Sequence, residues 1–136
     1  MIVTMEWLER YISIKKECED IKNRIDELDG WKGHGFSENP THSTSNEGLD
    51  RIIIKREQLY KKYLKKLSKG QAVVLEIEAF LEGVKDPETR TIIRLKYIDG
   101  YTWREVGDFL HLDYSACYRR VEAAIKNNNK NNKHLC

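Results

Sequence analysis

The chain has 136 residues, 34% of them charged, and a formal net charge of only +2. Its length allows one compact domain or two small helical ones, and the low net charge excludes a general polycation. The longest apolar runs are only a few residues, so the sequence predicts no signal peptide and no membrane span. Three widely spaced cysteines (Cys18, Cys117 and Cys136) imply no disulfide framework and fit a reducing cytoplasm.

Residues 4–29 predict a long amphipathic helix. Its apolar residues alternate at spacings of three and four, which places them on one stripe, as in a coiled coil: Trp7, Tyr11, Ile14, Cys18, Ile21, Ile25 and Leu28. Asp29-Gly30 is expected to end it. A long loop over residues 30–48, rich in Gly, Ser, Thr and Asn, should follow. A loop of this length inside a compact domain is uncommon, so it is either flexible or functional.

Residues 49–84 carry a second stripe with the same alternation: Leu49, Ile53, Arg56, Tyr60, Tyr63, Leu67, Gly70, Val74, Ile77, Leu81 and Val84. Gly70 is unfavourable in a helix interior. It therefore marks either a bend in one long helix, which we favour, or a break between two helices. Residues 4–29 hold five basic and eight acidic side chains, whereas residues 49–70 hold eight basic and two acidic ones. These opposite charges predict an antiparallel hairpin.

One thin hairpin cannot bury all of these apolar side chains. We expect a homodimer whose interface uses Trp7, Tyr11, Ile14, Tyr60, Tyr63 and Leu67. The alternative is that the stripes only close a monomeric core. The lysine cluster (Lys61, Lys62, Lys65, Lys66 and Lys69) is interpreted as a solvated face or as a partner of the first helix, in preference to a phosphate-binding stripe.

Residues 85–126 predict three short helices with sharp ends. Asp86-Pro87 offers an N-cap followed by a proline at the first helical position, and Asp99-Gly100 ends that helix. Thr102 and Glu105 form a capping box, and Val106, Phe109 and Leu110 supply the apolar face behind it. Asp113 is the expected N-cap of the third helix.

Three helices in this layout are typical of a helix-turn-helix DNA-binding unit. Its last helix should place Cys117, Val121 and Ala124 or Ile125 in the core. The second helix of such a motif lies in the major groove and presents its N-terminal residues to the bases. We expect base or near-base contacts from Ser115, Ala116, Tyr118 and Arg119, and phosphate contacts from Arg104, Tyr114, Arg120 and Lys126. A plain helical bundle is the alternative.

The charge of this segment is nearly balanced. Residues 84–126 hold eight basic and seven acidic side chains, so DNA binding needs cations gathered on one face, a dimer or a partner such as RNA polymerase. Residues 127–136 (NNNKNNKHLC) are low in apolar content and are expected to be a disordered tail. The predicted organisation is therefore a helical region over 1–84, a helix-turn-helix over 85–126 and a tail.

No catalytic or metal-binding pattern is found. His34, His42 and Glu38, like His134 and Cys136, lack zinc-ligand spacing, and the Gly33-His34-Gly35 segment is too short to hold a phosphate. We therefore expect no enzyme activity, no metal and no cofactor.

Residues 86–125 resemble region four of bacterial sigma factors. In that region a "Y-x-x-G" phrase precedes "T/S-x-x-E-I/V-A/G-x-x-L", and this chain has YIDG at 97–100 and TWREVGDFL at 102–110. The phrase YRRV at 118–121 resembles the "YYRR-L" of the ArpU/RinA type of phage transcriptional regulators. Asp113 replaces the usual Ser or Thr cap, and Cys117 replaces a larger residue.

This resemblance implies an all-α protein with a coiled-coil-like hairpin before a sigma-like helix-turn-helix. It also implies a phage or prophage regulator of late or lysis genes in a bacterial cytoplasm, with double-stranded DNA as its partner. The alternatives are a small terminase subunit and a protein–protein module acting on polymerase or another regulator. The sequence does not separate activator from repressor.

Overall fold

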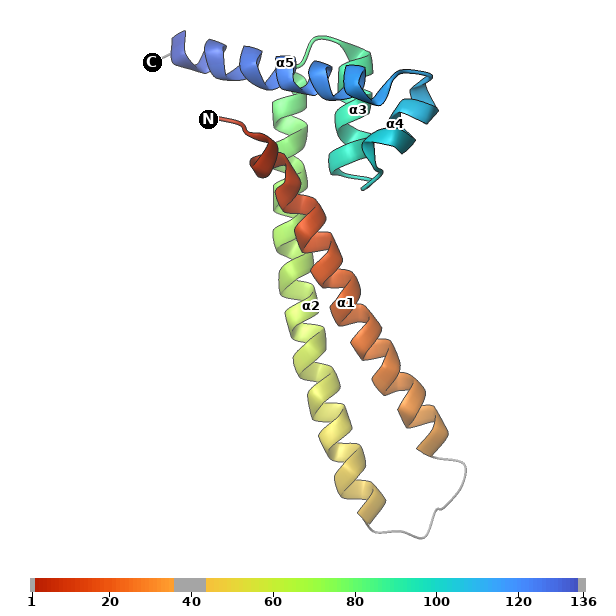
Figure 1. Cartoon of the computed structure of the whole chain (residues 1–136). Coiled ribbons are helices and arrows are strands. Elements are labelled where there is room, and N and C mark those ends of the chain that lie inside the picture. Colours follow the sequence, from red (N-terminus) through yellow and green to blue (C-terminus); the bar gives the residue numbers. More distant parts are fainter. Residues whose placement is uncertain (1, 36–43, 135–136) are drawn as a thin grey trace. The chain divides into compact units, whose positions relative to one another are not determined.

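The protein is all-helical, as the sequence predicts. The computed structural model describes residues 2–35 and 44–134, with side chains over 2–30 and 48–131. It holds five helices in these residues and no strand (Figure 1). They are α1 (Met5–Gly35), α2 (Thr44–Glu82), α3 (Pro87–Tyr97), α4 (Trp103–Leu110) and α5 (Tyr114–His134).

The chain divides into two compact units. The hairpin unit is Ile14–Lys69, and the terminal unit joins Met1–Ser13 to Gly70–Cys136. The first turns of α1 therefore belong with the helices at the other end of the sequence. The two long helices each contribute to both units.

In the hairpin unit, α1 and α2 run antiparallel. Arg56 Nε donates to Asp29 Oδ1 at 2.7 Å, and ten residues further along α2, Lys66 donates to Glu17 on α1. Cys18 and Ile25 of the predicted α1 stripe are buried. Pairs of exposed ions contribute little stability each, but these bridges tie the predicted acidic and basic segments together in one register.

The residues of α2 that face α1 differ from part of the predicted stripe. Arg56 and Lys66 contact α1 directly, and Leu59 and Tyr63 lie half-buried on the same side of α2. Tyr60 and Leu67, which the prediction placed in the stripe, are 45% and 37% exposed. The predicted stripe and the observed face share residues 56 and 63. They differ by one position elsewhere, 60 against 59 and 67 against 66, and adjacent positions are about 100° apart around the helix.

Three predicted boundaries differ from the structure. α1 continues past Gly30 to Gly35 and α2 starts at Thr44, so helix covers much of the segment expected to be a loop. Glu38, Pro40 and His42 lie outside the described residues, as does Cys136. Helix α2 is continuous through Gly70, in agreement with the favoured single helix. Finally, α5 continues to His134, where we expected a disordered tail.

The N-terminal segment stabilises the end of α5. Asn129 Nδ2 donates to the Val3 carbonyl and Asn129 Oδ1 accepts from the Val3 amide, both at 2.8 Å. Val3 itself is buried. These hydrogen bonds join residues 126 positions apart in the sequence. The composition of residues 127–136 alone therefore does not predict that α5 continues to His134.

The core of the terminal unit takes residues from every helix. Its most deeply buried side chains are Leu8 of α1, Ile77 and Leu81 of α2, Ile92, Ile93 and Tyr97 of α3, Val106 of α4, and Cys117 and Val121 of α5. The prediction for Cys117, Val121 and Ile125 is confirmed. Phe109 differs, because it is 57% exposed and packs edge-on against Tyr101 at 5.1 Å. The short α4 buries Val106 and Gly107 in its place.

The predicted start of α3, the turn after it and the predicted start of α4 are confirmed. The Asp86 carboxylate accepts from the Thr89 amide and hydroxyl, and Pro87 opens α3. Gly100 has a φ of +86°, a conformation that glycine adopts without steric cost. Both hydrogen bonds of the Thr102–Glu105 capping box are present.

An ion pair connects α3 to α2. Arg94 of α3 makes two hydrogen bonds to Glu78 of α2, and they lower the pKa of the Glu78 carboxyl.

Gly107 sets the packing of α4 against the start of α5. A Cβ at this position would lie 2.6 Å from the Leu112 carbonyl oxygen and 3.3 Å from the Tyr114 amide nitrogen. Both obstacles are backbone atoms, so they cannot move aside as a flexible side chain can. His111 adopts the left-handed conformation between the helices, with a φ of 55°.

We expect Gly107→Ala to lower the free energy of unfolding by about 1–3 kcal/mol, because overpacking at a close contact forces the backbone to shift. Chemical denaturation followed by circular dichroism measures this. Gly83→Ala is the matched control, since its Cβ would meet only the Phe80 carbonyl oxygen at 3.5 Å. Equal stability of the two variants would contradict the role assigned to Gly107.

The buried Tyr97 predicts a loss of stability at alkaline pH. Burial raises the pKa of its phenol well above the ordinary value of 10.0. In the unfolded chain Tyr97 loses its proton above about pH 10, while the folded protein keeps it. The free energy of unfolding should therefore fall by about 1.4 kcal/mol per pH unit in that range.

This prediction is measured by urea denaturation between about pH 9 and pH 11. Tyr97→Phe should reduce the alkaline slope, whereas Tyr114→Phe, which alters an exposed ring, serves as the control. An unchanged slope in Tyr97→Phe would contradict the prediction.

Candidate nucleic-acid interface

Helices α4 and α5 form a helix-turn-helix. Helix α4 ends at Leu110, residues 111–113 make the turn, and α5 begins at Tyr114. The Leu112 amide donates to the Gly107 carbonyl at 2.9 Å, which closes the end of α4. The Asp113 carbonyl accepts from the amides of Ala116 and Cys117, which starts α5. A short turn between two helices is the geometry in which a second helix can enter a DNA groove.

The first turns of α5 expose two tyrosines and one arginine. Tyr114 and Tyr118 are 54% and 41% exposed, and Arg119 is also exposed. Ser115 and Ala116 are half-buried. The Ser115 hydroxyl donates to Asp113 at 2.6 Å, and Arg119 Nε donates to the Ser115 carbonyl at 3.3 Å. Arg119 therefore has a weak contact with its own helix and can turn outward at little cost.

Tyr118 is supported by a chain of aromatic rings. It lies edge-on to Trp103 of α4 with ring centres 5.4 Å apart, and Trp103 lies edge-on to Tyr97 at 6.0 Å. The Lys96 ammonium lies over the Trp103 ring at 5.3 Å. Such contacts orient a ring, so the position of Tyr118 depends on α3 and α4 as well as on α5.

Arg120 differs from its neighbour Arg119 because it already has two acidic partners. Its guanidinium donates to Glu88 and lies 3.8 Å from Asp86. The pKa of Asp86 is lowered, first by hydrogen bonds from Thr89 and also by the charge of Arg120. The sequence predicted a phosphate contact for Arg120, and in the structure its charge connects α5 to the start of α3.

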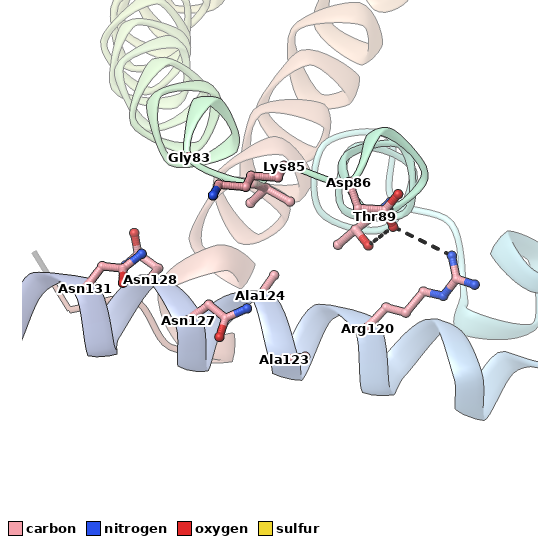
Figure 2. A pocket seen from close by; sticks show the side chains of 11 residues that line it. Gly83, Lys85, Asp86, Thr89, Arg120, Ala123, Ala124, Asn127, Asn128 and Asn131 are labelled. Atoms are coloured by element: carbon pink, nitrogen blue, oxygen red, sulfur yellow. Dashed lines mark hydrogen bonds and ion pairs between the residues drawn. The ribbon is translucent and has the colours of Figure 1, made fainter.

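A shallow pocket of about 420 Å³ lies beside Arg120 (Figure 2). Residues 83–86 line one side, and α5 lines the other with Ala123, Ala124, Asn127, Asn128 and Asn131. Thr89 at its edge is engaged with Asp86. Arg120 faces this pocket and lies about 100° around the helix axis from Arg119.

Arg119, Lys126 and Lys130 share one face of α5. All three are exposed, and their spacings of seven and four residues place them on the same side of a helix. Lys130 was missed because the helix was expected to end near Lys126, and its spacing from Arg119 is the signal that would have found it. Arg104 is exposed in the first turn of α4.

The residues predicted for an oligomer interface lie in two different environments. Trp7 packs edge-on against Phe80 at 6.2 Å with Arg10 over its ring, and Tyr11 and Ile14 are half-buried. Tyr63 is half-buried on the side of α2 that faces α1. Tyr60 and Leu67 are exposed, and so are Ile54 and Leu64 of the same helix.

The described side chains contain no grouping typical of metal or thiol chemistry. No cluster of three His, Cys, Asp or Glu residues among them is arranged to hold a metal ion. Cys18 and Cys117 are free and buried, and burial raises the pKa of both thiols. Within the described part of the chain, no helix is both long and apolar enough to cross a membrane.

Comparison with known proteins gives a family. No curated protein and no solved structure matches the chain. One family model matches residues 50–129, which include most of α2, all of α3 and α4 and most of α5. The matched segment is more than half of the sequence. The chain belongs to DUF1492, a family described as a protein of unknown function.

Proposed function

We propose that this protein is a sequence-specific DNA-binding regulator of transcription. The observation that carries the proposal is the helix-turn-helix of α4 and α5, with Tyr118 and Arg119 exposed on the first turns of its second helix. In DNA complexes of this motif, the N-terminal part of the second helix lies in the major groove.

The side chains at this position suit base recognition. An arginine can donate two hydrogen bonds to guanine, and an aromatic or small apolar group can contact the thymine methyl. Arg119 would read a base, with Ser115 and Ala116 allowing close approach of the helix. Tyr118 would contact the adjacent base or sugar from its support on Trp103.

The charge of α5 supports an anionic partner. The helix holds five basic side chains and one acidic side chain, Glu122. Lys126 and Lys130 continue the face of Arg119, and Arg104 and Tyr114 are exposed near helix starts. Phosphate contacts from such residues fix the position of a protein on the duplex without reading its sequence.

The biological setting proposed here rests on the sequence resemblance. The YIDG, TWREVGDFL and YRRV phrases resemble sigma region four and the ArpU/RinA type of phage regulators. They support control of late or lysis genes in the cytoplasm of a bacterial host, with contact to RNA polymerase. DNA binding by α5 does not depend on this setting and can be tested alone.

We expect Arg119→Ala to weaken binding to the operator by about 1–3 kcal/mol, roughly 5- to 150-fold, and to relax base preference at one position. Fluorescence polarisation against fragments selected from a random pool measures both effects. Arg24→Ala is the matched control, because it removes an exposed arginine from α1. Equal selectivity in wild type and Arg119→Ala would remove Arg119 from the reading site.

The exposed apolar side chains of α2 support self-association. Tyr60, Leu64 and Leu67 are between 37% and 46% exposed and share one side of α2 at spacings of four and three residues. Contiguous exposed apolar groups often mark an interface. A homodimer would present two copies of α5 to a two-fold or repeated DNA site. The proposed interface leaves out Trp7, which packs against Phe80, and Tyr63, which is half-buried on the side of α2 that faces α1.

We expect Leu64→Glu to shift a dimer toward monomer, because it introduces a charge at the centre of this surface. Sedimentation velocity at several protein concentrations measures the shift. Gln58→Glu adds the same charge at another exposed position of α2 and should leave the mass unchanged. A wild-type protein that sediments as a monomer at all concentrations would contradict the dimer.

A further inference from the structure

One segment of α2 holds lysines without any acidic residue. Residues 58–75 contain five lysines (Lys61, Lys62, Lys65, Lys66 and Lys69) and no Asp or Glu. All five lie within the hairpin unit. From the sequence, they were interpreted as a solvated face or as partners of the first helix. The structure shows which of these lysines form ion pairs with α1.

Pairing with α1 accounts for one of these lysines directly. Lys66 donates to Glu17. This hydrogen bond and the charge of Lys66, with a smaller contribution from Lys69, lower the pKa of the Glu17 carboxyl. The structure gives no ion pair for Lys61, Lys62, Lys65 or Lys69 among the described side chains, and all four are exposed. We call these four residues the lysine face.

The geometry of the helix concentrates these charges. At 3.6 residues per turn, the four side chains lie within an arc of about 100° over about 12 Å of helix axis. Lys61 and Lys65, Lys62 and Lys65, and Lys65 and Lys69 are neighbours at spacings of three or four residues. Like charges at these spacings repel each other and destabilise a helix, so a bound polyanion would relieve a cost that the free helix carries.

We infer that the lysine face is a second contact surface for the phosphate backbone of duplex DNA, separate from the base-reading residues of α5. The inference rests on the proposed function for the identity of the polyanion. A duplex carries one negative charge per about 1.7 Å of its axis, so 12 Å of α2 can lie along several phosphates. Long lysine side chains suit this contact because they act as flexible point charges.

The surface would add affinity without sequence preference. Each lysine that neutralises a phosphate releases a condensed counterion, and the slope of log Kd against log salt changes by about 0.9 per contact. The nearly balanced charge of residues 84–126 limits what that segment can contribute by itself. The lysine face would supply the affinity for the DNA backbone that residues 84–126 lack.

The test is a salt titration of the full chain with a labelled DNA duplex of arbitrary sequence. The variant Lys61→Gln, Lys62→Gln, Lys65→Gln keeps helix propensity while removing three charges. The matched control is Lys16→Gln, Lys22→Gln, Arg24→Gln, which removes three exposed charges from α1 of the same unit. We expect the α2 variant to reduce the slope by about two to three and the control to leave it unchanged.

The outcomes separate this inference from the proposed function. An α2 variant that matches wild type or the control overturns the inference, and if Arg119→Ala still loses base preference, the proposed function stands. Loss of binding in the α2 variant with no base preference in wild type supports the inference and overturns the proposed function. No duplex binding at all overturns both.

Binding of two other polyanions tests whether duplex DNA is the ligand of the lysine face. If an RNA duplex of equal length binds more tightly than DNA and loses that binding in the α2 variant, the DNA assignment is overturned. The same holds if poly-glutamate of equal charge competes as well as DNA. Weaker binding of both polymers supports the duplex DNA backbone as the ligand.

Discussion

The contact between the backbone of α4 and the start of α5 at Gly107 constrains how these two helices pack together. With no side chain at this position, residues 112–114 approach α4 more closely than a Cβ would allow. That approach fixes the rotation of α5, so that Cys117 and Val121 enter the core while Tyr118 and Arg119 stay exposed. The proposed base-reading surface is therefore a consequence of packing on the opposite side of the same helix.

The ends of the short helices α3 and α4 were predictable from sequence because their causes are local. The caps at Asp86 and Thr102 and the positive φ at Gly100 each depend on residues within one turn. The core face of α5 was predictable for a similar reason, because only one side of this helix carries apolar residues at helical spacing. The exposure of Tyr118 and Arg119 followed from the same period, whereas Ser115 and Ala116, also expected to face outward, are half-buried.

The features that sequence did not predict depend on partners far along the chain or on a choice between equivalent patterns. Helix α2 carries two interleaved apolar stripes, and only the position of α1 decides that Leu59, and not Tyr60, is the more covered. Arg120 has outward-facing spacing in sequence, but Glu88 lies within reach only after α3 and α5 pack. The helical end of α5 depends in part on Val3.

The pairing of Val3 with Asn129 has a consequence for folding during synthesis. Residues 1–13 are made before the hairpin unit, yet they complete a unit whose other helices are made after it. The hairpin unit has all of its residues once Lys69 has emerged from the ribosome, whereas Val3 must wait for Asn129. Contacts of such long sequence separation are slow to form. The N-terminal segment therefore stays without these partners until Asn129 has been made, and closing this contact joins it to the unit proposed to read DNA.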